Sequence, residues 1–99
     1  MDETPVELPI DGVLDLHSFR PSELGELIPA YLEACREKGI RHVRIIHGKG
    51  KGELRRGVHA ILARLPYVTA FRLAGEGGGG WGATVVELSG PGQEGRAPA

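Results

Sequence analysis

The spacing of apolar residues alternates along the chain between a pattern typical of strands and a pattern typical of helices. Residues 13–17 alternate apolar and polar side chains, so a short strand there places two leucines on one face. The same strand places Asp15 and His17 on its other face. From residue 24 onward the apolar positions fall three and four residues apart, which predicts a helix over 24–38.

This first helix carries signals for its start, its end and a local distortion. Pro21 suits the first helical turn, and Gly39 is well placed to end the helix. Pro29 lies inside the helix and removes the hydrogen bond to the carbonyl of Gly25. Because Pro29 lies off the apolar stripe, we expect one kinked helix rather than two.

The rest of the chain continues the alternation. A strand over 41–47 precedes a second helix, whose apolar face spans 54–65, and two further strands cover 68–73 and 83–88. The resulting β-α-β-α-β-β order predicts an α/β sandwich of two layers. Crossovers between parallel strands are right-handed, so its mixed four-stranded sheet carries both helices on one face if successive parallel strands move along it in one direction.

Composition separates this domain from its ends. Residues 1–11 are acidic and interrupted by proline, so we expect a loosely attached N-terminal arm. Residues 89–99 hold too little apolar surface to offset the entropy of ordering and are expected to form a flexible tail. The folded domain is therefore predicted to span residues 12–88.

Charge and cysteine content narrow the class of protein. The 99 residues carry 12 Lys and Arg against 13 Asp and Glu, which excludes a uniformly basic nucleic-acid-binding protein. Cys35 is the only cysteine, so no intramolecular disulfide forms, and we expect it to pack in the core. The sequence contains no long apolar run and begins with acidic residues, unlike a signal peptide. We therefore expect a cytoplasmic, monomeric domain with no membrane partner.

The basic residues are nevertheless concentrated in one part of the chain. Residues 36–64 contain nine Lys and Arg and two Asp and Glu, a net charge of +7. Such a patch is sufficient for weak, sequence-independent binding to a polymer of phosphates. The alternative is a solvated basic helix face with no ligand.

Candidate chemistry gathers where the first two strands end. If those strands are parallel neighbours, their carboxyl ends meet at one edge of the sheet, where open α/β sheets place their ligands. That edge would bring together Asp15, His17 and His47.

A glycine-rich segment follows directly and precedes the second helix. Alternating glycines expose backbone N–H groups, and a helix N-terminus adds partial positive charge, so the segment suits phosphate oxygens. It does not fit a nucleotide-hydrolysing P-loop, because Gly52 stands where that motif needs Ser or Thr. The candidate phosphate-binding residues are Gly48, Lys49, Gly50, Lys51, Gly52, Arg55 and Arg56.

Three short blocks together resemble the small MutS-related (Smr) domain. They are Leu-Asp-Leu-His at 14–17, His-Gly-Lys-Gly at 47–50 and the segment 78–86 that contains Trp81. The resemblance implies a fold similar to the C-terminal domain of translation initiation factor three. It also implies nucleic-acid binding, and several members of the family are nicking endonucleases.

The resemblance also assigns positions and shows departures. Asp15 and His17 match the first motif, and His47, Gly48 and Gly50 match the second. Ser18 stands where many members have glycine directly after the first histidine, and Arg20 where many have a capping threonine. The ATPase and mismatch-clamp domains of longer members have no counterpart in the chain, so we expect a stand-alone module.

These residues can be assigned roles in phosphodiester cleavage. His17 and His47 would share the roles of base and acid, while Lys49 and Lys51 would stabilise the charged phosphorane. Asp15 would orient His17 or hold a divalent metal. Each residue also has a structural alternative: Asp15 as a cap, His17 as a partner of backbone, His47 as a packed turn residue.

Metal and aromatic sites are less well defined by the sequence. One carboxylate and two imidazoles match no closed metal site, so no resident metal is assigned and a divalent cofactor stays open. Trp81 either stacks on an unpaired base or packs over the sheet. His42 and His59 have no evident partner in the sequence and are interpreted as structural.

Two functional hypotheses lead. The first is an endonuclease that nicks DNA or RNA with low sequence specificity. The second is a module that binds DNA or RNA, including ribosomal RNA, without cutting it. A third, an adaptor for a phosphorylated metabolite or a protein, has less support from the basic segment.

Overall fold

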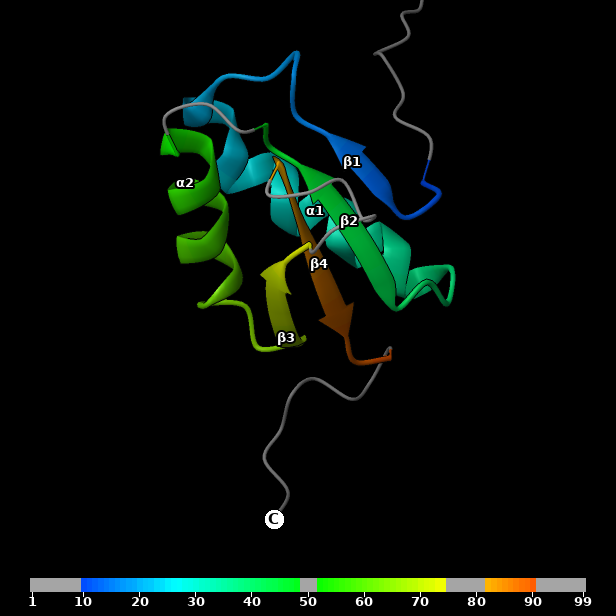
Figure 1. The fold of residues 1–99 in the computed structure, drawn as a ribbon. Coiled ribbons are helices and arrows are strands. Elements are labelled where there is room, and N and C mark those ends of the chain that lie inside the picture. The colour runs from blue at the N-terminus through cyan, green and yellow to red at the C-terminus, as the bar shows by residue number, and fades with distance from the viewer. Residues whose placement is uncertain (1–9, 49–51, 75–81, 91–99) are drawn as a thin grey trace, which may run out of the picture.

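The elements follow one another in the predicted order (Figure 1). The structure is a computed structural model that describes residues 10–48, 52–74 and 82–90. In chain order the elements are β1 (Val13–Asp15), η1 (Pro21–Glu23), α1 (Leu24–Glu37), β2 (His42–Ile46), α2 (Glu53–Leu62), β3 (Val68–Leu73) and β4 (Ala83–Leu88). Strands β3 and β4 have the predicted bounds, whereas β1, β2 and α2 are shorter than the sequence pattern indicates.

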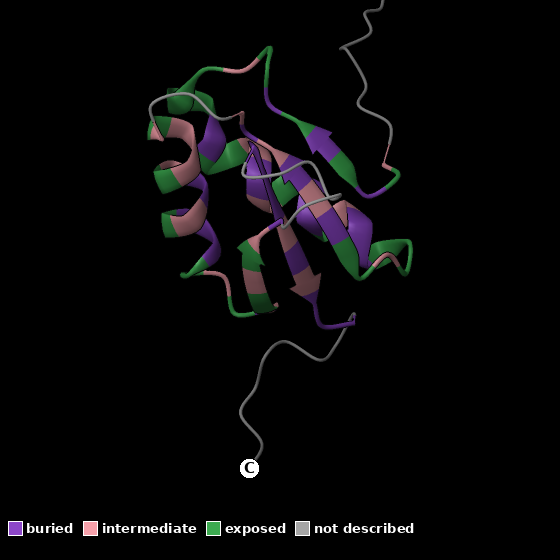
Figure 2. Ribbon diagram, viewed as in Figure 1, coloured by how far each residue is buried: buried purple, intermediate pink, exposed green. Residues whose placement is uncertain are grey.

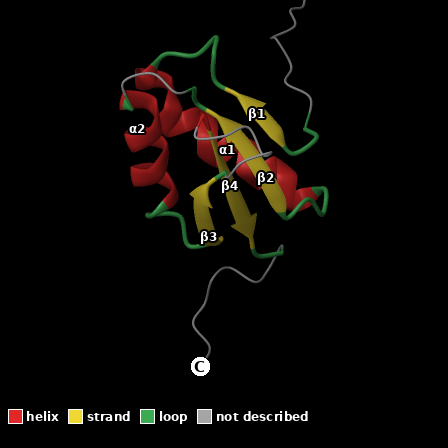
Figure 3. Cartoon of the chain, viewed as in Figure 1, coloured by secondary structure: helices red, strands yellow, loops and turns green. Residues whose placement is uncertain are grey.

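The four strands form one mixed sheet in the order β1-β2-β4-β3. Strands β1 and β2 are parallel, and β4 runs antiparallel to both β2 and β3. Strands β1, β2 and β3 therefore share one direction, and each β-α-β connection moves the same way along the sheet. This arrangement places α1 and α2 in a second layer on one side, as Figure 3 shows, and confirms the predicted fold class.

A single core fills the space between the two layers. Alternate residues of each central strand face the helices, for example Val43 and Ile45 on β2, and these are almost completely buried (Figure 2). The opposite side of the sheet carries more exposed residues, among them Val13, Asp15 and Arg72, and is called the outer face below. Cys35 lies in the core as expected, and its burial raises the pKa of its thiol.

Helix α1 tolerates Pro29 and ends as the sequence predicts. It continues through Pro29 as one helix, and the carbonyl deprived of its bond belongs to the exposed Gly25. The kink itself stays a prediction. At the other end Gly39 has φ +81°, its N–H donates to the carbonyl of Arg36, and the N–H of Ile40 donates to that of Cys35. These two bonds form a Schellman motif, which only glycine enters without strain.

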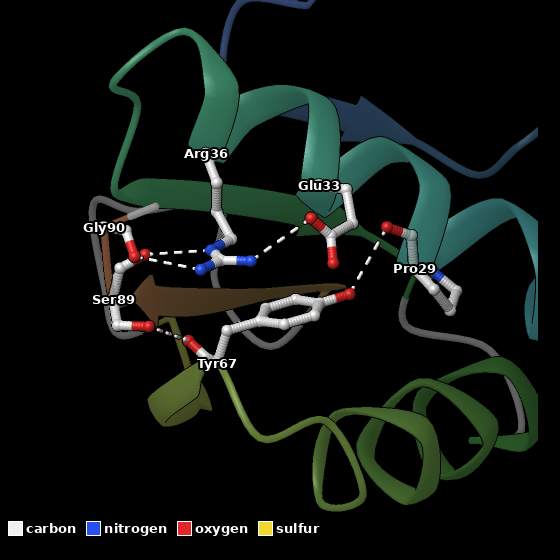
Figure 4. A network of polar contacts seen from close by, with 6 residues as sticks. All are labelled: Pro29, Glu33, Arg36, Tyr67, Ser89 and Gly90. Atoms are coloured by element: carbon white, nitrogen blue, oxygen red, sulfur yellow. Dashed lines mark hydrogen bonds and ion pairs between the residues drawn. The ribbon is translucent and has the colours of Figure 1, made fainter. Parts of the chain in front are cut away.

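Arg36 joins α1 to the end of β4 (Figure 4). Its side chain is 4% exposed, and it donates to the carbonyls of Ser89 at 3.1 Å and Gly90 at 2.9 Å. It also pairs with Glu33 at 3.2 Å and lies 4.5 Å from the centroid of the Tyr67 ring. Ser89 and Gly90, which the composition assigned to the flexible tail, are therefore part of the packed domain.

The two ends of the chain lie mostly outside the described residues. Of the expected acidic arm, Ile10 packs against the core and Asp11 accepts the N–H of Val13 at 3.1 Å. Residues 1–9 and 91–99 are not described. Within the described ranges, neither helix has the length and apolar content needed to cross a lipid bilayer.

Candidate nucleic-acid interface and active site

Asp15 and His17 form a pair directly after β1. The Asp15 Oδ1 atom accepts the backbone N–H of His17 at 2.9 Å and lies 2.5 Å from Nδ1 of its ring. The first of these bonds turns the chain away from the sheet, so the strand ends at Asp15 rather than at His17 as the alternation suggested. Both side chains remain open to solvent, with relative exposures of 54% for Asp15 and 72% for His17.

The electrostatics of the pair favour an ionised carboxylate. The backbone N–H of His17 is the largest influence and lowers the pKa of Asp15, while slight burial opposes this and the His17 ring lowers it further. An ionised carboxylate accepts a hydrogen bond and cannot donate one, so the proton between the two groups belongs to Nδ1 of His17. The Nε2 atom of His17 is then the ring nitrogen that carries a lone pair toward an outside ligand.

His47 follows β2 at the same edge of the sheet but lies on the other side of it. It is 6% exposed, and its Nε2 lies 2.8 Å from Oγ1 of Thr84. Its Nδ1 lies 3.1 Å from the carbonyl oxygen of Gly48. The parallel strands do bring the two histidines to neighbouring strand ends, since the backbone N–H of Leu16 donates to the carbonyl of Ile46.

The predicted catalytic group is therefore only partly assembled. Asp15 and His17 are together, but among the described residues no hydrogen bond or ion pair joins either of them to His47. Both ring nitrogens of His47 are occupied inside the protein. This geometry does not fit direct proton transfer between His47 and a substrate, and the role proposed for it below is different.

Sequence reasoning missed the partners of His47. His59 on α2, interpreted above as a structural residue without a partner, places its Nε2 atom 2.8 Å from the same Oγ1 of Thr84. Its ring also contacts that of His47, with centroids 6.2 Å apart, and that of Phe71 at 5.1 Å. Thr84 occupies the side of β4 that also carries Val86 and Leu88, and a polar residue among these core-facing positions was the available signal.

His59 makes stability depend on pH. Burial lowers the pKa of His59, and the nearby His47 and Arg55 lower it further, from a reference value of 6.5. The folded state then binds the proton less readily than the unfolded chain, so stability is fully present above pH 6.5 and is lost as the pH falls toward the lower, folded-state pKa.

We therefore expect His59→Gln to reduce the loss of unfolding free energy between pH 7.5 and pH 5.5, measured by urea denaturation. Glutamine keeps an N–H donor but does not titrate in this range. The exposed His42 provides the control, and an equal change in the His42→Gln variant would contradict this assignment.

The start of α2 has the features of an anion site. Gly48 and Gly52 have φ values of +85° and +87°, so both take the left-handed conformation that glycine favours. A Cβ placed on Gly52 would lie 3.0 Å from a guanidinium nitrogen of Arg55 and 3.1 Å from one of Arg56. Two cations thus surround a helix N-terminus, where partial positive charge already accumulates. Three predicted phosphate-binding residues, Lys49, Gly50 and Lys51, lie outside the described residues.

The basic segment does not form one continuous patch. Arg36 is buried against the end of β4, and Arg41 precedes β2 at the opposite edge of the sheet from the glycine segment. Arg44 lies on the outer face, paired in register with Val13 and Val85. Within residues 36–64, Arg55 and Arg56 are the described cations that lie beside Gly52 at the start of α2.

Trp81 and a divalent metal are the two remaining sites that the sequence left open. Trp81 lies outside the described residues, so its choice between base stacking and packing stays a prediction. Within residues 10–48, 52–74 and 82–90, no three side chains of His, Cys, Asp or Glu are grouped as metal ligands.

Comparison with known proteins places this arrangement in a family. The family model described as the Smr domain matches residues 14–89. The chain belongs to the Smr domain family. The matched span contains both strand ends, the glycine segment and Thr84.

Two relatives show the extent of the Smr match. The chain is 37% identical over 79 residues to the Endonuclease MutS2 of Halothermothrix orenii and 45% identical over 75 residues to that of Halalkalibacterium halodurans. These alignments cover 80% and 76% of this chain and 10% of each relative. The chain thus corresponds to about a tenth of the length of these relatives.

Solved Smr structures have the same fold. The Smr domain of Thermus thermophilus MutS2 superimposes with a TM-score of 0.75 at 35% identity, over 80% of this chain and 99% of that one. YdaL, a stand-alone small MutS-related protein from Escherichia coli, gives a TM-score of 0.69 at 29% identity, over 78% and 63%. The second similarity shows that an Smr fold also occurs in a stand-alone protein.

Proposed function

We propose that this Smr domain is a nucleic-acid-binding endonuclease that nicks phosphodiester bonds with low sequence specificity. The observation that carries the proposal is the exposed Asp15–His17 pair at the edge of the sheet where β2 ends and Gly48 follows. The names of the MutS2 relatives, which are endonucleases, support the same reaction class.

His17 is the proposed general base. Asp15 holds the proton of the ring on Nδ1, so Nε2 can take a proton from the attacking water, or from the ribose hydroxyl when the substrate is RNA. The negative charge of Asp15 then stabilises the imidazolium that forms. A solvent-exposed pair suits a polymer substrate, which must approach from outside the domain.

The start of α2 is the proposed phosphate-binding element. Arg55 and Arg56, together with the helix N-terminus, would neutralise the non-bridging oxygens of the scissile or a neighbouring phosphate. Lys49 and Lys51 would add two further cations. Contacts of this kind read phosphates rather than bases, which accounts for low sequence specificity.

Nicking of supercoiled plasmid and of structured RNA tests the proposal. Purified protein should convert the plasmid to the open-circular form or cleave the RNA, and an Asp15→Asn, His17→Asn double variant should not. The His42→Asn variant, also exposed but distant in sequence from the pair, should retain the activity. Equal activity in the double variant would assign the cleavage to another site or to a contaminant.

Binding tests the phosphate site separately from cleavage. We expect an Arg55→Ala, Arg56→Ala double variant to bind every sequence more weakly and to lower the salt dependence of log K by about 0.9 for each phosphate that these arginines neutralise on duplex DNA. The matched control is Arg64→Ala, beyond the opposite end of α2, which should leave the slope unchanged. An unchanged slope in the double variant would remove α2 from the interface.

The second candidate is a binding module that does not cut. The position of His47 favours it, because the structure leaves one exposed imidazole at the strand ends where the sequence predicted two. Cleavage without a metal benefits from both a base and an acid, and a single histidine supplies only one of them at a time. Salt-dependent binding without nicking, in the absence and presence of divalent metal, would select this candidate.

A further inference from the structure

Two histidines from different elements share one buried hydroxyl group. Thr84 is completely buried on β4, and its Oγ1 lies 2.8 Å from Nε2 of His47 and 2.8 Å from Nε2 of His59. A hydroxyl group has one proton to donate and can also accept. Both contacts are therefore satisfied when Oγ1 donates to one ring and accepts from the other.

The surroundings of His47 decide the direction of this chain. Its Nδ1 faces the carbonyl oxygen of Gly48, which can only accept, so Nδ1 must carry a proton. In neutral His47 the Nε2 atom then has a lone pair and accepts the proton of the Thr84 hydroxyl. His59 in turn donates its Nε2 proton to Oγ1. The hydrogen bonds run in one direction, from His59 through Thr84 and His47 to Gly48.

The groups that face His59 keep its ring uncharged at neutral pH. His59 packs against His47, which directly follows β2, against Phe71 from β3 and beside Arg55 on its own helix. Burial and these neighbours lower the pKa of His59, so its ring is uncharged at pH 7. With a proton on Nδ1 of His47 and on Nε2 of His59, every polar atom in this hydrogen-bond chain has a partner.

The end of the chain is Gly48, the first residue of the glycine segment. Its carbonyl is held by the His47 ring, and its N–H, together with that of His47, donates to the carbonyl of Gly82 at 2.8 Å. Both polar groups of Gly48 are thus bound, at a φ of +85°. Gly48 is therefore fixed by hydrogen bonds at both its N–H and its carbonyl group.

We propose that Thr84 and His59 are positioning residues, which set the tautomer of His47 and thereby hold Gly48, a predicted phosphate-binding residue, in its observed conformation. The inference rests on the proposed function for its ligand, but not for the hydrogen-bond chain itself. It gives His47 a role in orienting the site while the Asp15–His17 pair acts on the substrate. It also gives a role to residues 82–84, Gly-Ala-Thr, of the third Smr-like block. The proposed cleavage reaction does not use these residues.

Nitrogen-detected NMR of the whole chain tests the hydrogen-bond direction without any substrate. We expect the Nδ1-protonated tautomer for His47 and the Nε2-protonated tautomer for His59 at pH 7. An Nε2-protonated neutral His47, or a His59 with its Nε2 unprotonated, would overturn the proposal. This readout is independent of whether the protein binds or cuts nucleic acid.

Substitutions test the positioning role. Thr84→Val removes the hydroxyl at nearly constant size, and loss of a buried hydrogen bond should weaken nucleic-acid binding by roughly tenfold. Hydrogen exchange at the Gly48 amide should accelerate by a similar factor relative to the amides of β2. Thr84→Ser should restore both properties, and Thr69→Val, which removes an exposed hydroxyl from β3, should change neither.

The outcomes separate this inference from the proposed function. If the wild-type protein binds no nucleic acid, the proposed function fails. The histidine tautomers and the rate of hydrogen exchange at the Gly48 amide still test the positioning role. If Thr84→Val fails to fold, His59→Leu and His59→Gln replace it, since only glutamine can still donate to Oγ1. Unchanged exchange at Gly48 in a folded variant that lacks the hydroxyl, or in His59→Leu, would overturn the proposal.

Discussion

Replacing His17 by asparagine should lower the rate of nicking by about 10²–10⁴-fold, the range that general acid–base groups contribute. The side chain of His17 is 72% exposed and contacts Asp15, so its removal should leave the fold and the affinity for nucleic acid almost unchanged. The decisive measurement is therefore a single-turnover rate at saturating protein beside a dissociation constant. A loss confined to the rate identifies His17 as a catalytic residue.

Asp15→Asn provides the companion measurement. The amide oxygen can still accept the backbone N–H of His17, so the turn after β1 should persist while the negative charge beside the ring is removed. We expect a loss in rate of roughly tenfold or more, because the imidazolium is no longer stabilised and the Nδ1 proton is no longer fixed. Full activity in this variant would mean that Asp15 serves only as a cap.

The pH profile distinguishes one catalytic imidazole from two. Hydrogen bonds from His17 lower the pKa of Asp15, so the carboxylate stays ionised throughout the range in which imidazoles titrate. A single base then gives a rate that rises with pH and reaches a plateau. A bell-shaped profile would show that a second group donates a proton, and would return His47 to a catalytic role despite its burial.

Sequence patterns predicted the fold well because each pattern had one dominant physical cause. The helical spacing from Leu24 and the glycine at position 39 gave the extent of α1, including its Schellman end. Strands β3 and β4 matched their predicted bounds residue for residue. Right-handed crossovers then place both helices on one face, because the strand order β1-β2-β4-β3 moves the parallel strands one way along the sheet, as the prediction required.

The site was predicted less completely because side-chain orientation at a strand end depends on tertiary contacts. The sequence brought Asp15, His17 and His47 to one edge, which the parallel pairing of β1 and β2 confirms. It did not show the register, in which Leu14 and Ile45 pair and both face the core. His47, two residues after Ile45, therefore also faces the core, whereas Asp15, one residue after Leu14, faces solvent. Nor could the sequence pair His59 with Thr84, 25 residues away in the chain.

The basic segment illustrates the same limit for charge. A count along the sequence treats Arg36 and Arg55 alike, although the first is buried and the second lies near the start of α2. Arg36 falls on the core-facing side of α1, where the only partner evident in the sequence is Glu33, three residues earlier. Two of its partners, the carbonyls of Ser89 and Gly90, belong to the last two described residues of the chain, which composition alone assigned to a flexible tail.

Arg36→Met should destabilise the domain by about 3–5 kcal/mol, the range for breaking a buried charged network. Methionine fills much of the space of the arginine stem but cannot donate to the carbonyls of Ser89 and Gly90. Each of those two buried oxygens would be deprived of a charge-assisted hydrogen bond, and the cation–π interaction with the Tyr67 ring would be removed as well. Since domains of this size have free energies of unfolding of about 5–15 kcal/mol, the urea concentration at the midpoint of unfolding should fall substantially.

The matched comparison is Arg64→Met, which removes an exposed arginine and should change the free energy of unfolding by less than about 0.5 kcal/mol. Arg36→Lys should lie between the two, because an ammonium group cannot reach both carbonyls and Glu33 with the geometry of a guanidinium. The ordering of the three variants follows from the geometry of donors rather than from charge. If Arg36→Lys matched the wild type, a single positive charge would be sufficient at this position, and the fork of hydrogen bonds to Ser89 and Gly90 would contribute little to holding β4 against α1.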